Sequence, residues 1–280
     1  MKWTVADVME VMEERYPTFL QESWDKNGLI VGDPDQPVEK ILLAVDPVEA
    51  TAAQACEGGY DMMITHHPLY LRGTSFVSRL DYKGRIVHDL IKSDVALLNA
   101  HTSADAATRG VAWALAQAVG IEGVPFDPVD EDEAGNPRGL GRIGELPEPM
   151  TLEEFAAVVA KALPAGPHGI LIGAPGGDLK MQVQTVAVSG GSGDSFLNRA
   201  RELGADVYVT ADLRHHPASE HLEAGGPALI SGSHWATEWL WLPHLADDLE
   251  AAAKEAGVEL EIDVSRFVTE PWHAHMPTLG

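Results

Sequence analysis

Basic residues are scarce in this chain. Its 280 residues include 19 Lys and Arg against 43 Asp and Glu, which makes the formal net charge −24. Proteins bind nucleic acids largely by placing Lys and Arg against phosphates, and anionic membranes attract basic surfaces in the same way. The acidity therefore argues against both nucleic acid and membrane partners.

Cysteine and long apolar runs are lacking as well. The single cysteine, Cys56, cannot form an intrachain disulfide or a thiolate metal cluster, which favours a reducing compartment. No run approaches the roughly 18 to 20 apolar residues that a membrane span needs. The start, MKWTVADVMEVMEERYP, indicates an amphipathic helix and not a secretory leader. We therefore expect a soluble, cytoplasmic protein.

The composition is that of a globular protein, with 45% hydrophobic and 22% charged residues. Helical patterns alternate with short apolar runs typical of buried strands, and this alternation predicts an α/β fold. A capping-box signal at Thr151 and Glu154 predicts a helix that ends before Pro164. The predicted strands are ILLAV (41–45), MMIT (62–65), VALLN (95–99), VAVSG (186–190), DVYVT (206–210), ALIS (228–231) and VELEIDV (258–264).

An internal repeat organises these elements. GGYDMMIT (58–65) aligns with LGADVYVT (203–210), and VALLNAHTSAD (95–105) aligns with ALISGSHWATE (228–238). The first copy carries a loop that is about 12 residues longer, within PLYLRGTSFVSRLDY. We therefore predict two similar α/β halves, with the chain divided into 1–126, a connector with one helix at 127–185, and 186–280.

Histidines and carboxylates recur where the predicted strands end. His66 and His67 follow one strand directly, and each copy of the repeat then has a His with an acid four residues later: His101 with Asp105, and His234 with Glu238. Ligands in open α/β sheets sit at the carboxyl ends of strands. Four imidazoles and two carboxylates suffice for a two-metal site. Adjacent His66 and His67 serve one metal if the backbone turns at Pro68, and otherwise two.

Six segments carry a resemblance to a known family. In chain order they resemble the NIF-three-like dinuclear metal-centre proteins, some of which are named GTP cyclohydrolase I type 2, in a short form without an inserted domain. They are ESWDKNGLIVGDP (22–34), GGYDMMITHHPLY, NAHTSADAATRG, VAVSGGSGDSF, VYVTADLRHHP and SGSHWATE.

The resemblance implies two divalent metal ions per chain, of zinc, iron or manganese, with Asp105 and Glu238 as bridging ligands. It also implies two halves that face each other across the metal cleft, with Trp24, Asp25 and Asn27 near it, and a toroidal homohexamer. The implied ligands are His66, His67, His101, Asp105, His234 and Glu238.

Two further motifs are open to more than one interpretation. GGSGDSF (190–196) is either a phosphate-binding loop, although it has no P-loop lysine, or a tight turn before a helix. His215 and His216 lie beyond the positions that match His66 and His67 in the repeat. We interpret them as the nearest candidates for catalytic proton transfer; residues that line the cavity and metal ligands are the alternatives.

Two metals and a water molecule are typical of hydrolases. We therefore expect a metal-dependent hydrolase, and the resemblance implies that its substrate is a purine nucleotide such as GTP, opened with release of formate. A two-metal phosphoesterase uses the same ligands. The alternative from another class is a metal-handling or regulatory hexamer without turnover.

Overall fold

The computed structural model describes residues 2–278 and forms two compact units. The first unit joins the chain up to Ala107 with Leu242–Thr269, and the second joins Thr108–Trp241 with the residues from Glu270 onward. The units are discontinuous because strand β15, late in the chain, pairs in parallel with β4 of the first unit. The division of the chain into 1–126, 127–185 and 186–280 stays a prediction. None of the helices within residues 2–278 has the length and apolar character to cross a membrane.

The first unit contains a five-stranded sheet of order β15-β4-β5-β6-β2, in which only β2 is antiparallel to its neighbour. The strands of the first unit, of which β1 and β3 form a separate pair, are β1 (Trp3–Thr4), β2 (Gly28–Val31), β3 (Pro37–Val38), β4 (Lys40–Ala44), β5 (Met62–Thr65), β6 (Ala96–Asn99) and β15 (Glu261–Val264). Its helices are α1 (Val5–Arg15), η1 (Thr18–Leu20), α2 (Glu49–Glu57), α3 (Tyr82–Lys92), α4 (Thr102–Ala106) and all but the first residue of α10 (Trp241–Glu255).

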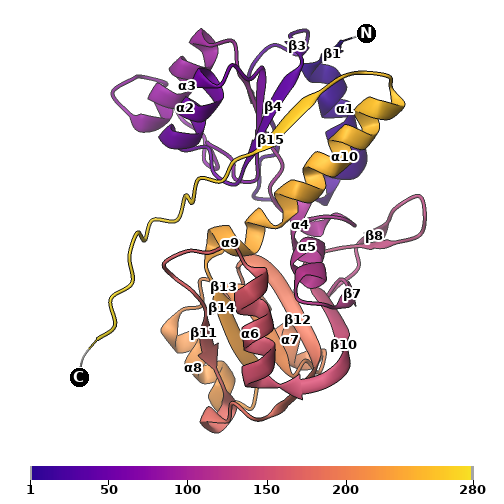
Figure 1. The fold of residues 1–280 in the computed structure, drawn as a ribbon, viewed down its shortest axis with the longest axis vertical. Coiled ribbons are helices and arrows are strands. Elements are labelled where there is room, and N and C mark those ends of the chain that lie inside the picture. The colour runs from indigo at the N-terminus through magenta and orange to yellow at the C-terminus, as the bar shows by residue number, and fades with distance from the viewer. Residues whose placement is uncertain (1, 279–280) are drawn as a thin grey trace. The chain divides into compact units, whose positions relative to one another are not determined.

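Helices cover both faces of this sheet (Figure 1). On one face, α2 and α3 bury Ala52, Ile86 and Leu90 against Leu42 and other strand residues. On the other face lie α1 and α10, joined where the Tyr16 hydroxyl donates to Asp248. The strands read as continuous apolar runs because both of their faces are covered.

The second unit contains a six-stranded mixed sheet of order β11-β14-β13-β12-β10-β7. The strands of the second unit, of which β8 and β9 form a separate pair, are β7 (Glu122–Val124), β8 (Asp130–Glu131), β9 (Pro137–Arg138), β10 (Arg142–Thr151), β11 (Leu171–Gly173), β12 (Gln182–Ser192), β13 (Val207–Ala211) and β14 (Ala228–Gly232). Its helices are α5 (Val111–Ala118), α6 (Leu152–Ala162), η2 (Pro175–Gly177), η3 (Asp194–Phe196), α7 (Leu197–Glu202), α8 (His215–Glu223) and α9 (His234–Trp239).

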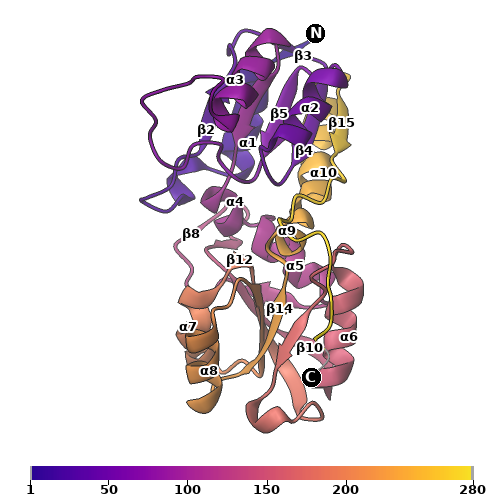
Figure 2. The ribbon, with the colours of Figure 1, turned by 90° about the vertical axis from the view of Figure 1, so that its left-hand side faces the viewer.

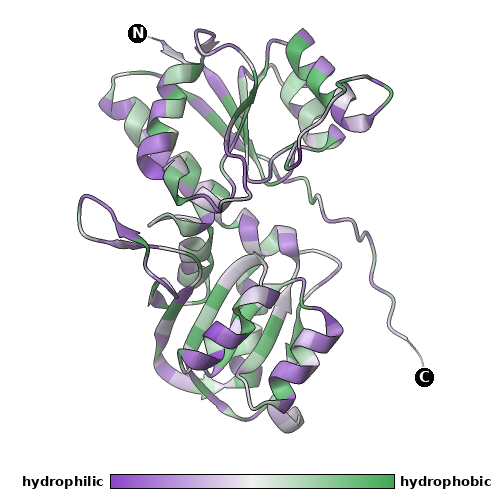
Figure 3. Cartoon of the chain, turned by 180° about the vertical axis from the view of Figure 1, so that it is seen from behind, coloured by the Kyte–Doolittle hydropathy of each residue, from purple (hydrophilic) through white to green (hydrophobic). Residues whose placement is uncertain are grey.

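This sheet also lies between two helical layers (Figure 2). On one face, α5 and α6 pack Leu115 and Phe155 on the strands, and on the other α7 and α8 pack Leu197 and Leu222. The strands of each unit consist mainly of hydrophobic residues, whereas the outer faces of the helices are hydrophilic (Figure 3).

Local sequence signals account for several of these elements. All the predicted strands are present, and α6 begins at the predicted cap, where the Thr151 hydroxyl accepts from the Glu154 amide. The mixed α/β class is confirmed. Strands β10 and β11, which lie inside the predicted connector, were missed because they pair antiparallel with distant segments and have no clear apolar run.

The repeat alignment matches β4, β5 and β6 with β12, β13 and β14. Each trio consists of adjacent parallel strands in chain order. The longer loop of the first copy runs from residue 66 to 81, whereas residues 212–214 make the matching connection in the second. The duplication itself stays a prediction.

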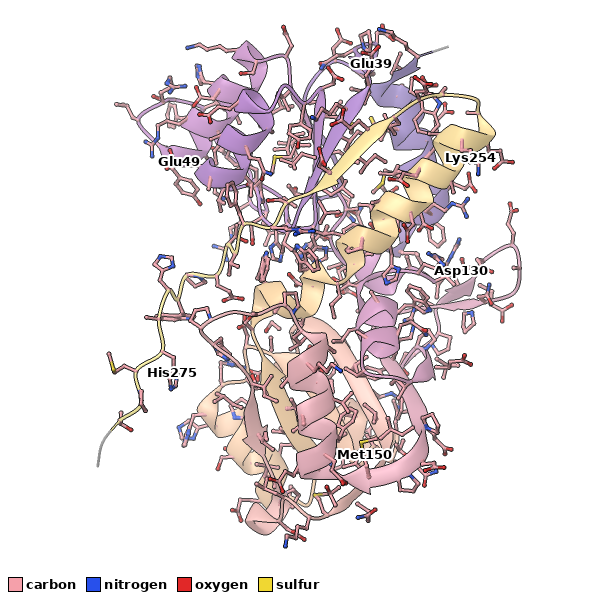
Figure 4. All side chains as sticks on the ribbon, in the orientation of Figure 1. Glu39, Glu49, Asp130, Met150, Lys254 and His275 are labelled. Atoms are coloured by element: carbon pink, nitrogen blue, oxygen red, sulfur yellow. The ribbon has the colours of Figure 1, made fainter. Side chains whose placement is uncertain are left out.

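Two exposed segments stand apart from the sheets. Asp130 lies in the short β8–β9 hairpin, which forms in the acidic stretch 127–138, and His275 lies in the tail after β15 (Figure 4). Both segments are largely exposed.

Candidate metal centre

Three imidazoles meet at the carboxyl edge of the first sheet. His66 and His67 directly follow β5, and His101 follows β6. These strands end at one level, because Thr65 pairs with Asn99. One ring nitrogen of each imidazole lies within 4.8 Å of those of the other two. The Nε2 atom of His66 also lies 3.7 Å from Asp105 Oδ1, so the first unit brings four of the predicted ligands together.

An oxygen atom holds the Nδ1 nitrogen of each of these imidazoles. The Nδ1···O distances are 3.1 Å from His66 to the Ala100 carbonyl, 2.7 Å from His67 to Asp46, and 2.9 Å from His101 to Asp25. Metal-binding histidines are oriented in this way, because the second ring nitrogen donates to a carboxylate or carbonyl. The three rings therefore have Nε2 as their remaining donor atom for a cation.

Asp25 is the most constrained of these oxygen partners. It is 1% exposed and accepts hydrogen bonds from His101 Nδ1 and from the amide and hydroxyl of Thr102. Burial by itself would raise its pKa, but the hydrogen bonds from His101 and Thr102 outweigh burial, and the pKa lies well below its ordinary value. The hydrogen bonds therefore favour the carboxylate form of Asp25.

Two further residues of the motif WDKN, Asn27 and Trp24, also contact His101. The Asn27 side-chain oxygen accepts from the His101 amide at 2.8 Å, and the Trp24 ring meets the imidazole edge-on with 5.8 Å between the ring centres. The three residues expected near a metal site thus all contact one predicted ligand.

The second unit places His234 and Glu238 on consecutive turns of α9. His234 Nε2 lies 2.9 Å from Glu238 Oε1, and His234 Nδ1 lies 2.6 Å from Asp212 Oδ2. Asp212 follows β13 directly and has a φ of 54°, a left-handed conformation that Asp tolerates better than most residues. The second unit thus repeats the arrangement of an imidazole held at Nδ1 by a carboxylate.

Two neighbouring carboxylates favour the protonated form of His234. Burial would lower its pKa, but the Glu238 and Asp212 carboxylates outweigh burial and raise the pKa to about 11. The hydrogen bond from His234 in turn lowers the pKa of Asp212. A cation that binds here displaces the imidazole proton, since a histidine ligand must be neutral.

The motif GGSGDSF makes room for Glu238. Gly191 has a φ of +63°, and a Cβ atom there would lie 2.3 Å from Glu238 Oε1 and 3.1 Å from His234 Nε2. The Gly191 amide donates to the Thr237 hydroxyl at 3.0 Å, which fixes the turn against α9. At this position the motif is a tight turn, and phosphate binding by it stays a prediction.

His215 and His216 lie in the first turn of α8 and are exposed. Their ring centres are 5.1 Å apart. Within residues 2–278, neither imidazole forms a hydrogen bond or ion pair with His234 or Glu238. Their catalytic role stays a prediction.

The sequence interpretation missed Asp46 and Asp212 as partners of histidines. A signal was present, because each acid follows a strand end, as the histidines do: Asp46 lies just beyond β4, and Asp212 directly after β13. The rule that ligands gather at strand ends therefore applies to the acids that orient them as well.

The three imidazoles of the first unit form a group that could hold a divalent transition metal. Imidazole and carboxylate ligands suit zinc, iron and manganese, and the cluster contains no thiolate. Fixed Nδ1 contacts orient the rings before a cation binds. An α/β fold with histidine and carboxylate clusters at the strand ends of both sheets defines a class of candidate metal-binding proteins.

Comparison with known proteins assigns the chain to a family. The model of the family Duf34/NIF3 (NGG1p interacting factor 3) matches residues 3–271. The chain therefore belongs to the Duf34/NIF3 family.

Relatives of known name support the assignment. A GTP cyclohydrolase 1 type 2 homolog of Streptomyces coelicolor is 47% identical over 273 residues, which cover 97% of this chain and 94% of the relative. A protein of the same name from Mycobacterium bovis is 31% identical, with 98% of this chain and 97% of the relative covered. That alignment extends over 377 positions, so the relative contains residues that have no counterpart here.

The fold is similar to solved structures as well. A hypothetical protein of Staphylococcus aureus has a TM-score of 0.88 at 26% identity, covering 98% of this chain and all of that one.

Proposed function

We propose that this chain is a dinuclear metal-binding hydrolase that acts on a purine nucleotide, as its resemblance to GTP cyclohydrolase 1 type 2 homologs suggests. The proposed ligands are His66, His67, His101, Asp105, His234 and Glu238. In this proposal the two clusters serve one pair of divalent ions in a cytoplasmic homohexamer.

One observation carries the proposal. Each of the four proposed histidine ligands has its Nδ1 nitrogen held by an oxygen, three of them by a carboxylate. Such contacts fix the tautomer and the ring orientation and make the imidazole a stronger ligand. If these histidines only filled the core, there would be no reason for all four to lie at strand ends with Nδ1 held by an oxygen.

Divalent ions bound by such ligands lower the pKa of water and stabilise the charge that develops on the group under attack. The residues of the chain orient the ligand rings and hold their tautomers. His215 or His216 is the proposed group for proton transfer, because Asp105 and Glu238 would be engaged as metal ligands.

Metal analysis and an activity assay test the proposal together. Purified protein should bind two ions per chain and release formate from GTP, and His66→Ala or Glu238→Ala should lower both metal content and activity. His275→Ala, in the exposed tail, is the matched control and should change neither. One ion or none in the wild type contradicts the dinuclear centre.

The two variants also distinguish a shared centre from two separate sites. In a shared centre, His66→Ala and Glu238→Ala each weaken the binding of both ions, because bridging ligands couple them. Separate sites would lose one ion per variant and keep the other at full affinity. Light scattering should give the mass of six chains, and a monomer would contradict the hexamer.

A second candidate function uses the same ligands without turnover. Full metal content with no release of formate, and no phosphate released from nucleotides or phosphoesters, would favour a metal-handling or regulatory oligomer. Phosphate release with no formate would favour the two-metal phosphoesterase.

A further inference from the structure

The surface around α3 is basic although the chain is acidic. Residues 71–92 consist of most of the loop that follows β5 together with α3, and we call them the basic segment. They contain five of the 19 basic residues of the chain and only two acids, so their net charge is +3. Arg72 and Lys92 are exposed and form no ion pair within residues 2–278. The basic segment therefore has positive charges available for an acidic partner.

The basic segment also exposes large apolar side chains. Phe76 is 83% exposed and Leu80 is 95% exposed. Single apolar residues at a surface are ordinary, whereas several in one place mark a site of contact with another protein. The other exposed apolar residues of the segment are Leu71, Val77, Tyr82 and Ile91.

Contacts with α3 hold the loop of the basic segment in place. His88 Nε2 lies 3.0 Å from the Val77 carbonyl oxygen. A Cβ atom at Gly84 would lie 1.9 Å from the Ser78 carbonyl oxygen, so the helix has glycine where the loop approaches it most closely. The loop thus has a defined course, and its exposed apolar side chains lie on an ordered backbone.

A surface of the opposite charge lies in the second unit of the same chain. The β8–β9 hairpin projects from that unit, and residues 127–133 contain five acids and no basic residue (Figure 1). Glu131 and Glu133 are exposed, and neither forms an ion pair in the part of the chain that the structure describes. Val129 adds an apolar side chain that is 69% exposed. The hairpin therefore combines apolar exposure with available negative charge.

We propose that the β8–β9 hairpin of one molecule docks on the basic segment of a second molecule of this chain. Opposite charges steer the two surfaces together, and Val129 packs against Phe76 and Leu80. Each molecule has both surfaces, so the contact joins unlike surfaces and repeats from molecule to molecule, as in the rings that such contacts form. The inference rests on the proposed function, because it names the surfaces that join the chains of the proposed homohexamer.

Charge reversal on either surface tests the contact in the full-length protein. One variant combines Arg72→Glu with Lys92→Glu, and the other combines Glu131→Lys with Glu133→Lys. Size-exclusion chromatography with light scattering, over a dilution series, measures the assembly. The protein concentration needed for assembly should rise about tenfold or more in each variant, because like charges then meet at the contact.

A mixture of the two variants is the decisive sample. Each reversed surface then meets a reversed surface of the opposite sign on the other variant, and each unchanged surface meets an unchanged one. An equimolar mixture should therefore recover the mass of the wild-type assembly. A contact within one molecule cannot be repaired by mixing.

Two further variants separate the contact from general effects. Phe76→Ser with Leu80→Ser removes exposed apolar groups without a change of charge, and it should weaken assembly as well. Glu10→Lys with Glu255→Lys changes the net charge as much as the hairpin variant does, at exposed positions outside both surfaces, and should leave the mass unchanged. The unfolding temperature and the metal content of single chains should stay close to those of the wild type in all variants.

Several results would overturn the inference. Wild-type mass in both charge-reversal variants excludes the contact, and so does a mixture that fails to recover the assembly. A wild type that is monomeric at every concentration contradicts both this contact and the proposed hexamer. A hexameric wild type with unaffected variants contradicts only the contact, and the proposed hydrolase is tested separately by metal content and formate release.

Discussion

The glycine at position 191 is required by its neighbours and not only by its backbone. A Cβ atom there would overlap Glu238 Oε1, whereas Gly204, which also has a positive φ, has open space around it. Gly191→Ala should therefore displace Glu238 and lower the metal content. Gly204→Ala introduces comparable backbone strain without the overlap, so it should lower the unfolding temperature and leave metal binding intact. Equal metal loss in both variants would show that strain alone is responsible.

Asp25 orients His101 through a short contact inside the first unit. Asp25→Asn keeps the shape and an acceptor oxygen but removes the charge that holds the Nδ1 proton. We expect metal affinity to fall about 10- to 100-fold, as for other carboxylates that orient histidine ligands. Competition against a coloured chelator measures the change. Asp35→Asn, on the exposed surface of the same unit, is the matched control; an equal effect there would refute the orienting role.

The middle strand of the second unit, β13, contains a buried phenol. Burial raises the pKa of Tyr208 to about 12, and its hydroxyl contacts Ser189 and the Gly193 carbonyl. The neutral form is favoured in the folded state, so its stabilising effect is complete below pH 10 and is lost as the pH rises towards 12.

Alkaline denaturation measures this loss. Between pH 10 and 12 the wild type should lose up to about 3 kcal/mol more than Tyr208→Phe, because two pKa units correspond to that free energy. Parallel losses in the two proteins would mean that Tyr208 does not cause the alkaline sensitivity.

Helix α6 depends on its first turn. Thr151 and Glu154 form a reciprocal capping box, in which each side chain accepts from the backbone amide of the other. Thr151→Ala should lower the free energy of unfolding by about 1 kcal/mol, because the Glu154 amide loses its side-chain acceptor. Urea denaturation measures the change. Thr151→Ser retains the hydroxyl and should lose much less, and an equal loss would assign the effect to the methyl group.

The charge of −24 acts on the whole molecule. Like charges repel in the compact state, and salt screens them. The unfolding temperature of the metal-free protein should therefore rise between about 0.02 and 0.5 M NaCl, as the Debye length falls from about 20 to 4 Å. At lower pH, where the net negative charge is smaller, the rise should be smaller. The same rise at both pH values would point to a general salt effect.

The acidity also bears on the proposed substrate. A nucleotide is an anion, and the chain has few basic side chains to receive it. Bound cations are the largest local charges in such sites, so the proposed metal pair would supply the positive field that the surface lacks. A nucleotide that binds equally well to metal-free protein would contradict this arrangement.

The sequence by itself determined the local elements and the histidine pairs at strand ends. Apolar runs, a capping box and the motifs around His66, His101 and His234 act within a few residues, so they are visible without a structure. Tertiary structure alone decided which acids meet these histidines, because Asp25 and Asp212 lie 76 and 22 residues from their partners. It also decided that β15 completes the first sheet, beside β4. Hydrogen bonds between strands connect segments that are distant in the sequence, and no local sequence pattern shows which segments will pair.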